Sequence, residues 1–135
     1  MTIFVDRIDG VIIPAAVCLC AMLLGLGAFQ LLLAAGAPIG HFAWGGQHRV
    51  LPVRLRVGSI VSTVLYAVFA IVVLTRAGVF SVLPYQVAQV GIWVIAGLLL
   101  LGAIPNLISR STPERYLMAP LALMLFALCV VVALG

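Results

Sequence analysis

LLLAAGAPIGHFAWGGQHRVLPVRLR, residues 31–56, interrupts a chain that is otherwise almost entirely apolar. One long apolar run ends in this segment, and a second begins directly after it. Gly36 followed by Pro38 is a strong helix stop, and Pro52 is a favourable first residue for a new helix. The segment therefore predicts the connection between two antiparallel helices that both cross a membrane.

The composition extends this expectation to the whole chain. Of the 135 residues, 66% are hydrophobic and 7% are charged, whereas a soluble domain carries about 25% charged residues. A helix needs about 20 apolar residues to cross a bilayer core of about 30 Å. Four such helices use nearly all of the chain. The expected fold is therefore all-α, a single transmembrane domain over 1–135 built as an integral membrane bundle of four antiparallel transmembrane helices.

Caps and prolines predict where these helices begin and end. We expect helices over about 9–36, 52–77, 84–104 and 113–134. Asp9 is expected to cap the first helix, and the third is expected to end before Pro105. Ser111 or Thr112 is expected to cap the fourth helix, which Pro120 should kink.

The arginines predict the orientation. The chain has seven basic residues, all of them arginine. Five lie in the connections after the first and third helices or directly beside them: Arg49, Arg54, Arg56, Arg110 and Arg115. Only Arg7 and Arg76 lie on the other side. Because positive residues favour the cytoplasm, this bias predicts a multi-pass cell-membrane protein with both termini outside. The first apolar run is too long for a signal peptide, so we expect the mature chain to begin at Met1.

The connection after the first helix is predicted to be an ordered interfacial loop. Its apolar side chains are too numerous for free solution, and exposed backbone is not tolerated in hydrocarbon. Trp44 is expected at the depth of the lipid headgroups, with Gly45 and Gly46 turning the chain back towards water. The side chains of His41 and His48 are expected to form hydrogen bonds with neighbouring backbone or with Glu114.

The two loops on the arginine-rich side hold the candidate binding residues. These are His41, Trp44, Gln47, His48, Arg49, Arg54, Arg56, Asn106, Arg110, Glu114 and Arg115. Arginine forks and the positive end of the fourth helix would suit a phosphate or carboxylate headgroup. The alternative is that the arginines only determine topology and that Trp44 is an interfacial anchor.

Catalysis, metal binding and ion-coupled transport have little support in the sequence. His41 and His48 share one loop without an acidic or thiol partner beside them, which disfavours zinc or haem. Asp6 and Asp9 are predicted on the opposite side of the membrane from both histidines, so a Ser-His-Asp triad cannot form within one subunit. No ionisable residue is predicted in mid-membrane. We therefore expect no catalytic residues, no metal, no cofactor and no nucleic-acid partner.

Small residues predict where helices approach closely. They form a stripe on the second helix (Gly58, Ser59, Ser62, Thr63, Ala67 and Ala70) and a pair on the first (Ala21 and Gly25). These small residues are expected either to allow close packing of helices within the monomer or to form the interface of a homo-oligomer.

Three classes of function remain open. The first is a non-enzymatic accessory or interaction subunit of a larger membrane complex, or a binder of anionic lipid. The second is an oligomeric channel or transporter for a small anion or neutral solute, with a polar path from Gln86 and Gln89 past Tyr66 to Gln30. The third is a membrane enzyme that acts on a lipid headgroup.

Two segments, GAPIGHFAWGGQHRVLPVRLRVGS and NLISRSTPERYLMAP, carry a resemblance that covers most of the chain. They resemble an uncharacterised family of small four-helix bacterial inner-membrane proteins with a G-A-P-x-G, G-G, L-P-x-x-L-R-x-x-S loop. The resemblance implies a bacterial inner-membrane location, and it carries no assigned activity.

Overall fold

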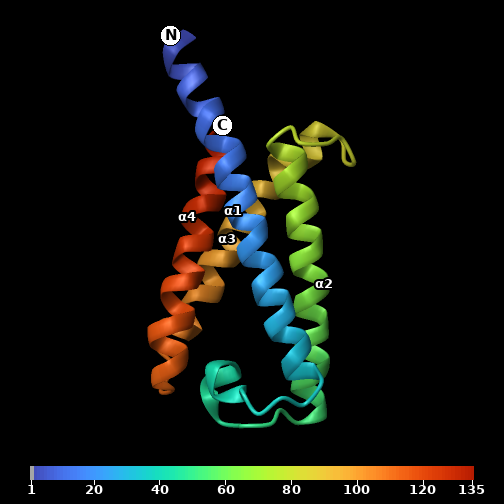
Figure 1. Ribbon diagram of the computed structural model, residues 1–135, viewed down its shortest axis with the longest axis vertical. Coiled ribbons are helices and arrows are strands. Elements are labelled where there is room, and N and C mark those ends of the chain that lie inside the picture. The colour runs from blue at the N-terminus through green and yellow to red at the C-terminus, as the bar shows by residue number, and fades with distance from the viewer. Residues whose placement is uncertain (1) are drawn as a thin grey trace.

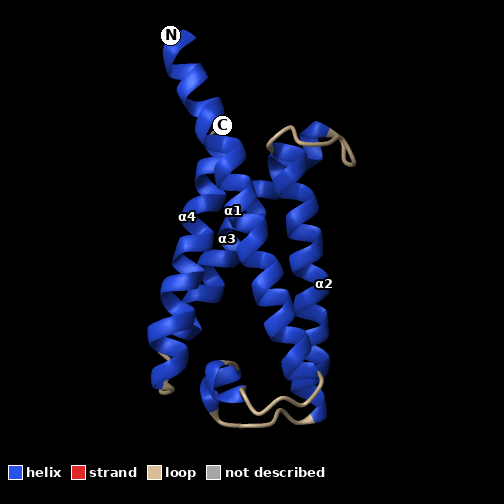
Figure 2. Ribbon diagram, in the orientation of Figure 1, coloured by secondary structure: helices blue, strands red, loops and turns tan. Residues whose placement is uncertain are grey.

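The structure is a computed structural model that describes the backbone of residues 2–135 and the side chains of residues 10–135. Helices account for all of its regular elements (Figures 1 and 2). They are α1 (Thr2–Ala34), the short 3-10 helices η1 (Gly40–Phe42) and η2 (Trp44–Gly46), α2 (Val53–Arg76), α3 (Tyr85–Leu107), the π-helical turn η3 (Glu114–Met118) and α4 (Ala119–Leu134).

Four helical segments are long and apolar enough to cross a membrane: Gly10–Ala34, Val53–Arg76, Tyr85–Leu107 and Glu114–Leu134. The shortest has 21 residues, which at about 1.5 Å per residue reaches the thickness of a bilayer core. Successive helices run in opposite directions (Figure 1). The all-α bundle of four antiparallel helices is therefore confirmed, with membrane insertion inferred from its composition.

The bundle consists of two helical hairpins. α1 packs mainly on α2 and α3 mainly on α4, while α1 with α4 and α2 with α3 join the hairpins. α1 therefore lies diagonally across from α3. The core shared by all four helices is in the half nearest the chain ends, and it includes Ala16, Leu19, Val73, Ile92, Cys129 and Val132. Towards the other end the hairpins diverge, and the segment between α1 and α2 lies across that end of the bundle (Figure 1).

Two glycines end helices as their sequence positions predict. Gly36 has φ 95° and Gly78 has φ 80°, a left-handed conformation that glycine adopts without strain. The N–H of Gly36 donates to the carbonyl of Leu33 and that of Ala37 to Leu32, with the same pattern at Gly78 and Val79. These paired bonds satisfy the last carbonyls of α1 and α2 as Schellman motifs.

Two predicted helix ends are wrong. α1 begins at Thr2 rather than at Asp9, because the segment before Asp9 contains no proline or glycine that would stop a helix. Asp9 therefore lies inside α1 and is not its cap, and Pro14 lies well inside the helix. α3 continues through Pro105 to Leu107. A proline in the last turn of a helix removes one hydrogen bond without preventing the residues after it from remaining helical.

The start of the fourth membrane segment also differs from expectation. The residues from Glu114 to Met118 form a π-helical turn, in which the N–H of Ala119 donates to the carbonyl of Glu114. Pro120 follows directly and would clash with the carbonyl four residues earlier in a regular α-helix. The wider turn accommodates this proline. The hydroxyl of Ser111 does not cap the helix, because it is used elsewhere.

Candidate functional site

The connection between α1 and α2, residues 36–52, is held in one shape by its own backbone. The N–H of Gly40 donates to the carbonyl of Arg49 over 2.9 Å, which joins the two ends of the loop. A Cβ at Gly40 would collide with the backbone carbonyl of His48. Gly45 and Gly46 have φ 82° and 73° and turn the chain between these ends. The close approach at Gly40 therefore requires glycine for steric reasons.

Trp44 fastens the loop to α2. Its indole Nε1 donates to the hydroxyl of Ser59 over 3.2 Å. The ring covers Gly58, where an added Cβ would lie 2.8 Å from the Cη2 atom of Trp44. Trp44 is the one residue other than glycine with a positive φ, 52°, among the described residues. The sequence identified Trp44 as an interfacial anchor and Gly58 and Ser59 as small residues, and the structure brings them together.

The loop is also fastened to the start of the fourth segment. The hydroxyl of Ser111 donates a short hydrogen bond to the backbone carbonyl of His41. Gly46 packs against Ser111 so closely that a Cβ at Gly46 would collide with the serine side chain. The loop thus bridges both hairpins at the end where their helices diverge.

Glu114 belongs to a small buried network. The hydroxyl of Ser109 donates to the Glu114 carboxylate over 2.8 Å and accepts the N–H of Ser111 over 3.1 Å. Only 4% of Glu114 is exposed. In a capping box the Glu114 carboxylate would accept the backbone N–H of Ser111 directly. Here the Ser109 hydroxyl lies between the two groups and bonds to both. The carboxylate thus accepts its hydrogen bond within the α3–α4 connection. The sequence had offered it as one of two partners for the histidines, the other being neighbouring backbone.

The arginines at this end of the bundle have different environments. The Nε of Arg56 donates to the carbonyl of Leu51 over 2.8 Å, and its guanidinium lies against Gly36. Arg56 is half-buried and holds the end of the loop to the first turn of α2. The other four, Arg49, Arg54, Arg110 and Arg115, are exposed. The guanidinium of Arg115 lies 5.0 Å from the ring centre of Tyr116.

All eleven candidate residues lie in the loop, in the α3–α4 connection or at the adjoining ends of α2, α3 and the fourth segment. The ring of His41 lies 4.3 Å from that of Phe42, centre to centre. His48 and Asn106 are half-buried, and Gln47 is exposed. We use the name loop end for residues 36–52, the α3–α4 connection and the ends of the helices that adjoin them. Within residues 10–135, no group of three His, Cys, Asp or Glu side chains could hold a metal ion.

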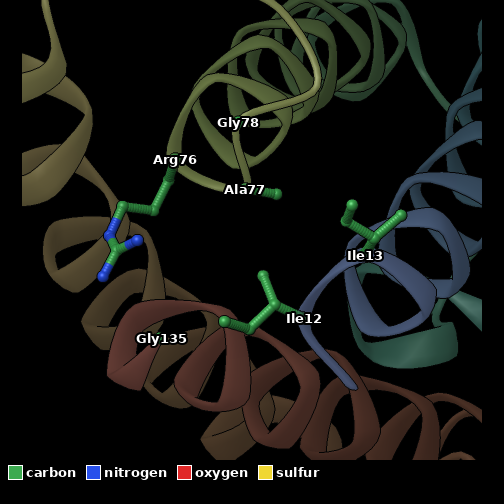
Figure 3. A pocket seen from close by; sticks show the side chains of 6 residues that line it. All are labelled: Ile12, Ile13, Arg76, Ala77, Gly78 and Gly135. Carbon is green, nitrogen blue, oxygen red and sulfur yellow. The ribbon is translucent and has the colours of Figure 1, made fainter. Parts of the chain in front are cut away.

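The opposite end of the bundle holds an arginine whose structural role the sequence did not reveal. Arg76 is 9% exposed and donates from Nη2 to the carbonyl of Ala133 over 3.0 Å. Its guanidinium lies 5.6 Å from the ring centre of Tyr85, so one side chain connects α2, α3 and α4. Arg76 also forms one wall of a pocket of about 200 Å³ (Figure 3). The only sequence signal was a basic residue in the last turn of a helix, where the helix dipole favours it.

The polar residues considered for a transport path do not join within one chain. Gln30 and Tyr66 are half-buried on α1 and α2, and Tyr66 packs against the shared core. Gln86 and Gln89 are exposed on α3. The four residues therefore fall into two sets, one between the helices of a hairpin and one on the surface.

The fold and the loop end place the chain in the class of multi-pass helical membrane proteins. No family model, no curated protein and no solved structure matches the chain.

Proposed function

We propose that this protein is a non-enzymatic membrane protein whose loop end binds the phosphate groups of anionic lipids. The exposed arginines Arg49, Arg54, Arg110 and Arg115 supply the donors. A guanidinium presents several N–H groups in a planar fork that matches the oxygens of a phosphate.

The observation that carries this proposal is that the one carboxylate at the loop end, Glu114, is buried. Glu114 is buried and accepts a hydrogen bond from Ser109, whereas the four arginines point to the exterior. The surface of this end therefore carries several positive charges, and the negative charge lies beneath it. Such a surface attracts anionic headgroups at about 1 kcal/mol for each basic residue near the membrane.

The rigidity of the loop supports the proposal. Contacts of Trp44 with Ser59 and of Ser111 with His41 hold the loop to both hairpins. Donors on an ordered platform lose less entropy when a headgroup binds than donors on a mobile loop. Trp44 is 42% exposed, and an amphipathic indole favours the headgroup region of a bilayer.

The same arginines support an orientation. The loop end carries five of the seven arginines. In the proposal this end faces the cytoplasm of a bacterial inner membrane, and both termini lie outside. Membrane-impermeant labelling of single cysteines at positions 48 and 81 tests this orientation in intact cells. Labelling at position 48 from outside would contradict it.

Lipid selectivity tests the binding function. The full chain is titrated with phosphatidylglycerol or phosphatidylcholine and analysed by native mass spectrometry. We expect phosphatidylglycerol to bind more tightly. Combined replacement of Arg54, Arg110 and Arg115 by glutamine should reduce this preference by tenfold or more, since each arginine contributes about 1 kcal/mol.

The matched control replaces the same three residues by lysine. It keeps the charge and removes the planar fork, so it should retain more of the preference than the glutamine variant does. Equal affinity of the unmodified protein for both lipids would contradict the proposal. A preference that survives all three glutamine substitutions would also contradict it.

A further inference from the structure

The outer flank of α3 carries polar groups that a lipid-facing helix does not need. Residues spaced by three and four form one stripe on a helix. On α3 such a stripe consists of Gln86, Gln89, Trp93, Gly97 and Leu100, all of them exposed. We name this stripe the α3 flank. It lies on the opposite side of α3 from Gly91, which packs against Val72 of α2.

Contacts between helices indicate how deep these residues lie. The guanidinium of Arg76 and the ring of Tyr85 are in contact, which sets one level for the ends of α2 and α3. Four residues along α3 from Tyr85, Gln89 lies about 6 Å inside that level, and Trp93 lies about 12 Å inside. A second contact gives a similar result. Gly91 packs against Val72, which lies one turn inside Arg76, and this places Gln89 and Trp93 about 3 Å less deep than the first contact does.

Polar groups at such depths have a cost if they face lipid. An amide without a hydrogen-bond partner in hydrocarbon is unfavourable by several kcal/mol. Trp93 is 50% exposed, although an indole N–H is more favourable at the membrane interface than below it. Gln89 and Trp93 also line a shallow hollow of about 540 Å³ together with Val90 and Val94. A neighbouring helix could fill this hollow and hydrogen-bond to the amide.

We propose that a second copy of this chain packs on the α3 flank, as a parallel two-fold pair centred on Gln89 and Trp93. The bias of five of the seven arginines to one end favours the same orientation for every copy. The two-fold axis is then parallel to the membrane normal, and each residue faces its own equivalent. A glutamine amide has both a carbonyl acceptor and an NH₂ donor, so two facing Gln89 side chains satisfy each other. This self-complementarity is the reason for assigning the flank to a second copy.

Gly97 supports close approach in the same pair. An added Cβ at Gly97 would meet no atom within 4 Å in the monomer. Nothing inside one chain therefore requires glycine at this position. A backbone without a side chain lets two membrane helices approach closely, and interhelical hydrogen bonds then become accessible.

Photo-crosslinking in liposomes tests which face is used. Benzoylphenylalanine replaces Val90 in the hollow or, as the matched control, Val17 on α1. Val17 is 55% exposed and lies on the helix diagonal to α3. It is one turn beyond Ile12 and Ile13, which line the same pocket as Arg76. We expect a dimer adduct from position 90 and none from position 17. An adduct from position 17 alone would overturn the proposal.

Subunit counting by single-molecule photobleaching measures the strength of the pair. The unmodified chain should show two bleaching steps at high protein density. Gln89→Leu should weaken dimerisation by about threefold to tenfold, the range that membrane interhelical hydrogen bonds give. Gly97→Leu should weaken it by at least as much by separating the helices, and Val17→Leu should leave it unchanged.

Three results would overturn the proposal. They are a monomer at every protein density, a dimer that is insensitive to both Gln89→Leu and Gly97→Leu, and an assembly of more than two subunits. Gln89 and Gly97 are both exposed, so we expect the Gln89→Leu and Gly97→Leu variants to fold. Circular dichroism checks this. Lipid selectivity at the loop end is a separate measurement on a separate surface, so the two proposals stand or fall independently.

Discussion

Gly58→Ala should release the loop from α2. The new methyl group would lie 2.8 Å from Cη2 and 2.9 Å from Cζ2 of Trp44, well inside the normal separation of carbon atoms of about 3.5 to 4.0 Å. The indole must therefore move, and the hydrogen bond from its Nε1 to Ser59 is lost. The same change places alanine in a helix, where it is more favourable than glycine.

These effects have different sizes. Overpacking costs about 1 to 3 kcal/mol, and a lost hydrogen bond costs about 0.5 to 1.5 kcal/mol. The helix propensity of alanine, up to about 1 kcal/mol, is gained whether the loop is closed or open, so it does not enter this difference. The net effect on the free energy of loop opening is therefore about 1.5 to 4.5 kcal/mol, which is a factor of about 10 or more in the opening equilibrium.

Hydrogen–deuterium exchange of peptides covering residues 36–52 measures this equilibrium in nanodiscs. Gly25→Ala is the matched control, because a Cβ at Gly25 meets no atom within 4 Å. We expect exchange in the loop to rise with Gly58→Ala and to stay unchanged with Gly25→Ala. Unchanged exchange in the Gly58→Ala variant, or an equal rise in both variants, would refute the argument from Trp44 packing.

Other substitutions test the remaining contacts. Gly40→Ala should open the loop more than Gly58→Ala in the same exchange measurement, because its Cβ meets backbone atoms that cannot rotate away. Ser109→Ala should lower the free energy of unfolding by about 1.5 to 3 kcal/mol, since it removes a hydrogen bond to the buried Glu114 carboxylate. Arg76→Gln should lower it by a similar amount by removing the charged donor to the Ala133 carbonyl. Denaturant titration in mixed micelles measures both losses.

Each of these predictions has a contrasting variant. Gly45→Ala meets only the strain of its positive φ, about 1 to 2 kcal/mol, because no atom lies within 4 Å of its Cβ. Glu114→Gln in the Ser109→Ala background should recover part of the stability by removing the buried charge. Arg76→Lys keeps the charge without the fork and should recover part of the loss. A loop that is more open in Gly45→Ala than in Gly40→Ala would contradict the steric argument. If Ser109→Ala or Arg76→Gln left the free energy of unfolding unchanged, the stabilising role of the corresponding hydrogen bond would be contradicted.

The sequence by itself determined the class of fold. Long apolar runs separated by short polar segments leave a chain of this length little alternative to membrane helices, because backbone hydrogen bonds must be satisfied within each segment. Local chemistry also determined the ends marked by Gly36 and Gly78, since the left-handed cap depends on one residue and its immediate neighbours. The start of α1 and the end of α3 were misjudged. Asp9 and Pro105 are boundary signals that a helix can override where its neighbours favour continuation.

The contacts that shape the loop end were decided only by the tertiary structure. Periodicity identified Gly58 and Ser59 as small residues but not their contact with Trp44, which depends on how the loop folds back on α2. The partner of Glu114 was also beyond local inference, because the hydrogen bond from Ser109 depends on how the chain turns between α3 and the fourth segment. Burial of Arg76 depends on the meeting of three helix ends. Local propensity acts through neighbours in the sequence, whereas these contacts depend on which helices are brought together in space.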